Sequence, residues 1–83
     1  MEMKKGMLAV SKAGHDAGER YVIAAVDNNY VYLVDGRIRT LDKPKKKKKK
    51  HIQIIGRTYD LEGATDVKIK RILKDCLLYT SPS

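Results

Sequence analysis

The feature that most constrains this chain is a run of lysines near its middle. Lysine fills seven of the eight positions from Lys43 to Lys50, and Pro44 is the exception. The chain has 18 Lys and Arg in all, so the 11 outside the run are nearly balanced by 10 Asp and Glu. Because adjacent ammonium groups repel one another, we expect residues 42–50 to form a loop rather than a folded element.

Apolar, strand-like sequence lies on both sides of the lysine run. A disordered solubilising tail would normally stand at a terminus. The internal position therefore favours a run that a polyanion neutralises over one that is merely solvated. Nucleic acid is the commonest polyanion of this kind.

Length and composition predict one small β-domain. At 83 residues the chain has room for a single domain, of a size at which the buried fraction of surface is low. It contains no Phe and no Trp, so its core must consist mainly of Val, Ile, Leu, Ala and Met. No stretch approaches the ~20 apolar residues of a membrane span, and no signal-peptide pattern follows the N-terminal lysines. We expect a cytoplasmic protein without a membrane partner.

Few residues suit catalysis or metal binding. Cys76 is the only cysteine, which argues against an intrachain disulfide and a cysteine-rich zinc site. His15 and His51 lie far apart and lack carboxylate or cysteine neighbours at ligand spacing, and Ser11 has no nearby base. We therefore expect no enzyme activity, metal, cofactor or small-molecule substrate.

Runs of β-branched and aromatic residues predict about five short strands. They cover residues 7–12, 20–26, 30–34, 37–41 and 51–55. Asn28-Asn29 and Asp35-Gly36 separate the middle strands, and an Asp-Gly pair is typical of a two-residue type I′ turn. Pro44 ends the fourth strand because it lacks a backbone donor. Short strands with tight turns predict a small SH3-like barrel, mainly β, which closes on itself and so removes exposed sheet edges.

Two-residue turns would also fix the register and the two faces of the sheet. The expected pairs are Ala24 with Leu33, Val26 with Val31, Leu33 with Ile38, and Val31 with Thr40. These residues would form one buried face together with Leu8, Val10 and Val22. The opposite face would carry Tyr30, Tyr32, Arg37 and Arg39, with Ile23 and Val34 among them and Tyr32 across from Arg39.

A short basic helix is expected at residues 65–75, after a linker at residues 56–64. Thr65 is a typical N-cap, and Asp66 suits the positive end of the helix dipole. Ile69, Ile72 and Leu73 fall on one side of the helix. A helix of about ten residues must dock on something, since isolated helices below ~12 residues barely form in water.

The closing octet, residues 76–83, resembles one reading frame of the transposase adapter used in sequencing libraries. We therefore expect a non-native tail there, and a native chain that continues past Asp75. An ordinary frayed end is the alternative. On either interpretation, no function is assigned to Cys76 or Tyr79.

The segment from Gly6 to Asp27 resembles a KOW motif, which is a strand, a loop ending in a near-obligatory glycine, and a second strand. Gly18 matches the glycine, and residues 11–14 match the loop entry. Val22, Ile23 and Val26 match the apolar second strand. With the Asp-Gly hairpin and the lysine run, residues 1–75 resemble the short KOW-domain RNA-binding proteins of bacteria, which are similar to large-subunit ribosomal proteins of archaea and eukaryotes. The resemblance implies an SH3-like barrel at residues 1–55 that binds RNA, foremost ribosomal RNA or the large ribosomal subunit.

The residue chemistry independently favours an RNA contact. The loop glycines would let the backbone approach a phosphate, arginines bind phosphate bidentately or stack on bases, and tyrosines stack on unpaired bases. The lysine loop would lie beside the glycine loop and follow adjacent phosphates. The expected RNA-binding residues are Lys12, Gly14, His15, Gly18, Arg20, Tyr32, Arg37, Arg39, Lys43, Lys45, Lys46, Lys47, Lys48, Lys49, Lys50 and His51.

Other interpretations remain open. Gly14 and Gly18 could serve only as turn residues, and Tyr30 and Tyr32 could serve only as cross-strand contacts. A protein-interaction barrel of the transcription elongation or antitermination type would place the lysines on an acidic protein. Attachment to anionic lipid is a further alternative, weakened because no apolar anchor accompanies the charge.

Overall fold

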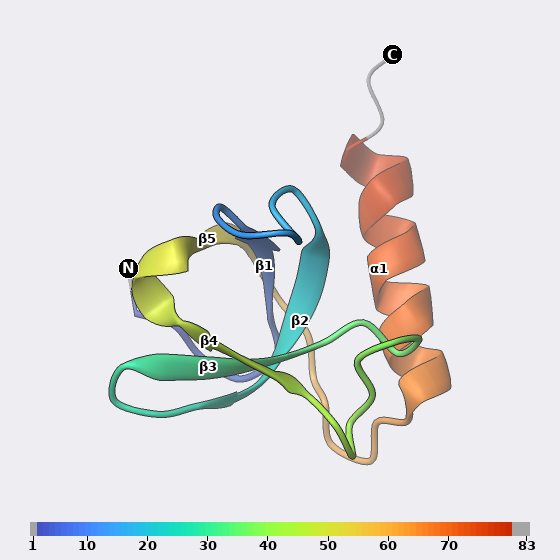
Figure 1. Cartoon of the computed structure of the whole chain (residues 1–83). Coiled ribbons are helices and arrows are strands. Elements are labelled where there is room, and N and C mark those ends of the chain that lie inside the picture. The colour runs from blue at the N-terminus through green and yellow to red at the C-terminus, as the bar shows by residue number, and fades with distance from the viewer. Residues whose placement is uncertain (1, 81–83) are drawn as a thin grey trace.

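Five antiparallel strands form one sheet that curls into a half-barrel, with a helix standing beside it (Figure 1). The computed structural model describes residues 2–80, and only the backbone of residues 56, 57 and 76–80. The strand order across the sheet is β4-β3-β2-β1-β5. The elements are β1 (Met7–Ser11), β2 (Arg20–Val26), β3 (Tyr30–Val34), β4 (Lys45–Lys48), the 3-10 turn η1 (Lys49–His51), β5 (Ile52–Thr58) and α1 (Asp66–Thr80). The predicted fold class, mainly β with a short C-terminal helix, is confirmed.

The second and third strands have the bounds expected from the sequence, and Val26 lies opposite Val31 as predicted. The rest of the predicted register is wrong. A bulge between Ile23 and Ala25 places Ile23, not Ala24, opposite Leu33. Because one inserted residue reverses the direction of every side chain beyond it, Ile23 turns into the half-barrel.

Buried clusters lie on both faces of the sheet, whereas the sequence predicted one buried face. The interior of the half-barrel holds Met7, Ala9, Tyr21, Ile23, Val31, Leu33 and Ile52. A second cluster on the outer face joins the sheet to α1 and the segment before it, and contains Leu8, Val22, Val34, Leu61, Ile69 and Ile72. The assignment of Leu8 and Val22 to the same face as Val31 and Leu33 is therefore wrong.

The predicted strand at residues 37–41 is a loop. The Asp35 carboxylate accepts hydrogen bonds from the backbone N–H groups of Arg37 (2.8 Å) and Arg39 (2.9 Å). The N–H groups of Asp35 and Gly36 in turn donate to the carbonyl oxygen of Arg39. These bonds close the chain on itself, so the Asp-Gly pair does not start a two-residue hairpin. Ile38, expected in the core, is 80% exposed.

The lysine run supplies the fourth strand instead. In β4, Lys45, Lys46, Lys47 and Lys48 lie opposite Leu33, Tyr32, Val31 and Tyr30 of β3, respectively. The expectation of a loop throughout residues 42–50 is therefore wrong, and Tyr32 faces Lys46 rather than Arg39. Side chains of a strand alternate between its two faces, so extended backbone directs consecutive ammonium groups apart.

Helix α1 begins where the sequence predicts. The Thr65 hydroxyl accepts a hydrogen bond from the N–H of Lys68 (3.3 Å), and the Asp66 carboxylate accepts one from the N–H of Leu41 (2.8 Å). The second bond ties the 35–44 loop to the start of the helix. Helix α1 continues past Asp75 to Thr80, and the rest of the expected non-native tail lies outside the described residues. No helix within residues 2–80 has the length and apolar character needed to cross a membrane.

Candidate functional site

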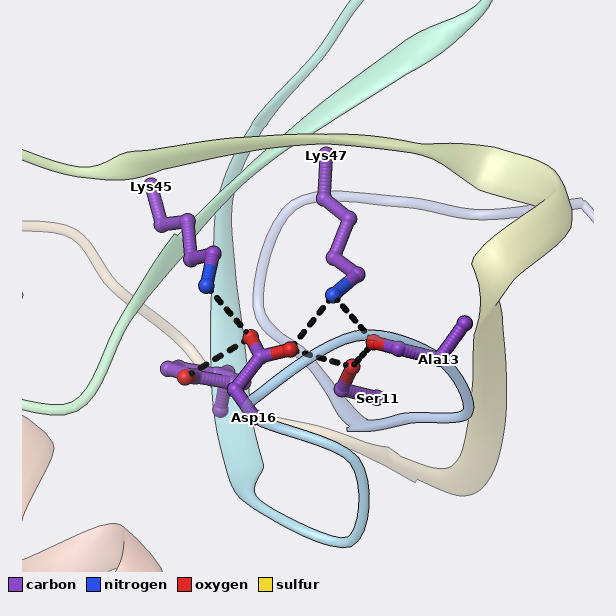
Figure 2. Close-up of polar contacts among 6 residues, drawn as sticks. Ser11, Ala13, Asp16, Lys45 and Lys47 are labelled. Carbon is purple, nitrogen blue, oxygen red and sulfur yellow. Dashed lines mark hydrogen bonds and ion pairs between the residues drawn. The ribbon is translucent and has the colours of Figure 1, made fainter.

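The most connected polar group is the carboxylate of Asp16, in the loop between β1 and β2 (Figure 2). It binds the ammonium groups of Lys45 (2.8 Å) and Lys47 (2.5 Å). It also accepts hydrogen bonds from the hydroxyls of Ser11 (2.9 Å) and Tyr21 (3.1 Å). We call these five residues the Asp16 cluster.

Strand alternation brings two lysines into this cluster. Lys45 and Lys47 lie opposite Leu33 and Val31, whose side chains belong to the half-barrel interior. Their stems therefore project over the β1–β2 loop, where the Lys47 ammonium also donates to the carbonyl oxygen of Ala13 (2.7 Å). Both contacts place the lysine run beside the glycine-containing loop, as the sequence suggested. Two of the expected RNA-binding lysines, Lys45 and Lys47, are therefore engaged in contacts within the protein itself.

The Asp16 cluster strongly favours the ionised carboxylate. Burial alone would raise the pKa of Asp16, but the hydrogen bonds from Lys45, Lys47, Ser11 and Tyr21 together outweigh burial and hold the pKa well below its usual value. Burial, followed by the nearby Asp16 charge, raises the pKa of Tyr21 to about 12. The Tyr21 phenol therefore stays protonated as a donor to Asp16 throughout the physiological range.

The other two lysines of β4 point to the outside. Lys46 and Lys48 are exposed, and they lie opposite Tyr32 and Tyr30 on the outer side of the sheet. The Lys46 ammonium lies 4.3 Å from the centre of the Tyr30 ring, a cation–π contact. No carboxylate among the described residues pairs with Lys46 or Lys48. We call these two tyrosines and two lysines the outer Tyr/Lys face.

The remaining predicted residues extend the positive charge beyond β4. Lys48, Lys49 and Lys50 border a hollow of about 430 Å³ together with Tyr30 and the Asn28-Asn29 turn. The backbone N–H of Lys12 donates to the carbonyl oxygen of His51 (2.8 Å), which places the end of β1 against η1. Lys43 is exposed and lies in the loop before β4.

The two predicted arginines lie away from Tyr32. Arg37 and Arg39 line a hollow of about 350 Å³ with His15 and Lys45, and with the acidic residues Asp16, Glu19 and Asp35. Gly18, Arg20 and Arg37 also line a groove of about 560 Å³ whose other wall includes Lys70 and Lys74 of α1. The structure thus divides the predicted site into the lysine and tyrosine surface of β3–β4 and a mixed-charge surface formed by the two long loops. Gly14 belongs to the loop that holds Asp16.

Sequence reasoning missed Asp16, Ser11 and Tyr21 as partners of the lysine run. One signal could have revealed them: if the run is extended, alternate lysines share one face of the sheet and require a nearby acid. Asp16 lies in a loop already expected to neighbour the run. Tyr30, for which base stacking and a purely sheet-stabilising role were both left open, lies on the outer Tyr/Lys face beneath Lys46.

The protein is thus a small five-stranded half-barrel in which the Asp16 cluster holds the lysine strand β4. The chain matches no protein-family model and no curated protein. Within the described residues, no three His, Cys, Asp or Glu side chains gather in a way that could hold a metal ion.

Proposed function

We propose that the protein is a non-enzymatic, cytoplasmic RNA-binding module of the KOW type that contacts ribosomal RNA or the large ribosomal subunit. One observation supports this proposal more strongly than the others. The outward lysines Lys46 and Lys48 are followed in the chain by Lys49 and Lys50. Among the described residues, no carboxylate forms an ion pair with any of these four lysines. Such a strip of like charge beside aromatic rings suits a sugar–phosphate chain.

In this proposal the lysine run has two roles, because alternate lysines of β4 lie on opposite faces of the sheet. Lys45 and Lys47 are held by Asp16 and fasten β4 to the β1–β2 loop. This anchoring keeps the backbone of β4 extended, so that Lys46 and Lys48 are presented at a fixed spacing. Pre-ordering of the cationic side chains lowers the entropy that RNA binding must overcome.

The geometry of the β1–β2 loop supports the KOW assignment. Gly18 has a φ of +90°, in a region that L side chains rarely adopt, and its N–H donates to the carbonyl oxygen of Ser11 (2.8 Å). A glycine at this point lets the loop close immediately before β2. This is the place of the glycine in the motif that the segment from Gly6 to Asp27 resembles.

We expect the purified protein to bind structured RNA with a strong salt dependence. If Lys46, Lys48, Lys49 and Lys50 each neutralise one phosphate, log affinity should fall with log salt at a slope of about −2.8 where the contacted strand is unpaired, and up to about −3.6 where it is in a duplex. Filter binding across a salt series measures this slope. Absence of binding at low salt, or binding that is indifferent to salt, would contradict the proposal.

Two further measurements separate the proposed partner from its rivals. Sedimentation of cell extracts should place the protein with large ribosomal subunits, and nuclease treatment should release it. A protein partner would instead remain bound after RNA removal. Sedimentation with vesicles of acidic lipid, in the absence of RNA, would reveal the lipid alternative.

A further inference from the structure

A second feature of the outer surface is an apolar groove beside Tyr32. It has a volume of about 410 Å³, and its lining includes Tyr32, Ala24, Ala25, Leu41, Pro44 and Lys5. Small-molecule sites in proteins are commonly ~300 to 1,000 Å³ and mostly apolar, with few polar groups. The groove therefore has the size and lining of a site for a small flat group.

Two small residues at the bulge in β2 border this groove. Ala24 and Ala25 are both part of its lining, and Ala25 lies directly opposite Tyr32 on β3, so the tyrosine has a methyl group as its cross-strand neighbour on that side. Ala25 is exposed and Tyr32 is partly exposed. A larger side chain opposite Tyr32 would ordinarily pack on the ring. Here the ring borders open space instead.

Two lysines lie close to Tyr32 or the groove. Lys46 lies opposite Tyr32 on β4, and Lys5 is part of the groove lining from the N-terminal segment. An occupant that suits both the groove and the lysines therefore combines an apolar, flat group with negative charge close to it. A nucleobase carried between two phosphates of a strand has this combination.

Resting on the proposed function, we propose that this groove binds an unstacked base of single-stranded RNA. The base lies against the Tyr32 ring, and the phosphates on either side of it lie against Lys46 and Lys5. Tyr30 is unsuited to this role because the Lys46 ammonium already covers its ring at 4.3 Å. Bases within a duplex are paired and stacked, so the groove selects loops, bulges and strand ends.

The test compares a short oligouridine with an abasic ribose–phosphate oligomer of the same length, which carries the same charge without bases. The wild-type protein should bind the oligouridine about 10-fold more tightly, in keeping with the stacking of one base on a tyrosine. Tyr32→Leu removes the aromatic ring, and Ala25→Leu fills the groove from the solvent side. Each should reduce oligouridine affinity about 10-fold and leave abasic affinity unchanged.

The possible outcomes separate this inference from the proposed function. Equal wild-type affinity for both oligomers, with no effect of either variant, would overturn the base-binding groove while leaving RNA binding intact. Failure of both oligomers and of structured RNA to bind would overturn the proposed function itself. Thermal unfolding of both variants checks that the fold is retained. If Tyr32→Leu is unstable, the affinities of Ala25→Leu decide the outcome.

Discussion

Replacing Asp16 with Asn is expected to lower the free energy of unfolding by about 3 kcal/mol, the lower end of the loss for breaking a buried ion pair. The Lys47 side chain is only 10% exposed and Lys45 is 26% exposed. Without the carboxylate, both ammonium groups remain close together in a poorly solvated place. A domain of this size has a total stability of roughly 4 to 12 kcal/mol, so the loss would be large. Urea unfolding measures it.

The pH dependence of the same variant gives an independent check. In the wild type, the stabilisation by ionised Asp16 is complete above the unfolded-state pKa of 3.8 and is lost as the pH falls towards the lower folded-state pKa. The stabilities of wild type and Asp16→Asn should therefore converge in acid. Asp42→Asn is the matched control, because Asp42 is exposed and should change stability little. Equal losses in the two variants would contradict the central role of Asp16.

Replacing Gly36 with Ala is expected to lower the free energy of unfolding by about 3 kcal/mol, from backbone strain and overpacking together. Gly36 has a φ of +77°, and an added methyl group would collide with the carbonyl oxygen of Asp66 and approach the backbone nitrogen of Lys70 at 3.0 Å. These atoms belong to the first turns of α1, so the helix must move away from the sheet. Urea unfolding measures the loss, and far-ultraviolet circular dichroism reports the helix.

Gly63→Ala is the control for this prediction. Gly63 has a similar φ of +68°, but nothing lies within 4 Å of an added methyl group. It should therefore lose only the conformational part, about 1 kcal/mol. Equal effects at the two glycines would mean that contact with α1 at Gly36 contributes nothing to stability.

Local patterns predicted much of the fold correctly. Alternating β-branched and aromatic residues placed β2 and β3, and Thr65 with Asp66 placed the start of α1. These signals act within a few residues of the chain. The face assignments failed at the bulge in β2, because the register of a whole strand depends on one inserted residue that the sequence does not mark.

The prediction that the lysine run forms a loop was wrong, and the reason is a tertiary one. Strand propensity and charge repulsion both argue against extended pairing for consecutive lysines. Tertiary contacts outweigh them here, since β3 supplies the backbone partners and Asp16 supplies a counter-charge about 30 residues earlier in the chain. Within the candidate site, Lys45 and Lys47 consequently point towards Asp16 while Lys46 and Lys48 point outward, and the predicted placement of Arg39 beside Tyr32 is wrong.

The two roles of the lysine run are tested most directly by comparing two charge-matched pairs of substitutions within β4. Lys46→Gln with Lys48→Gln removes two outward charges, and Lys45→Gln with Lys47→Gln removes two that bind Asp16. Filter binding to RNA across a salt series, at a temperature where both variants are folded, measures their effects. We predict that the outward pair makes the slope shallower by about 1.4 and keeps the stability, whereas the inward pair keeps the slope and lowers the stability. An equal loss of RNA affinity and slope in the two variants would contradict the division of the lysine run into an anchoring face and a binding face.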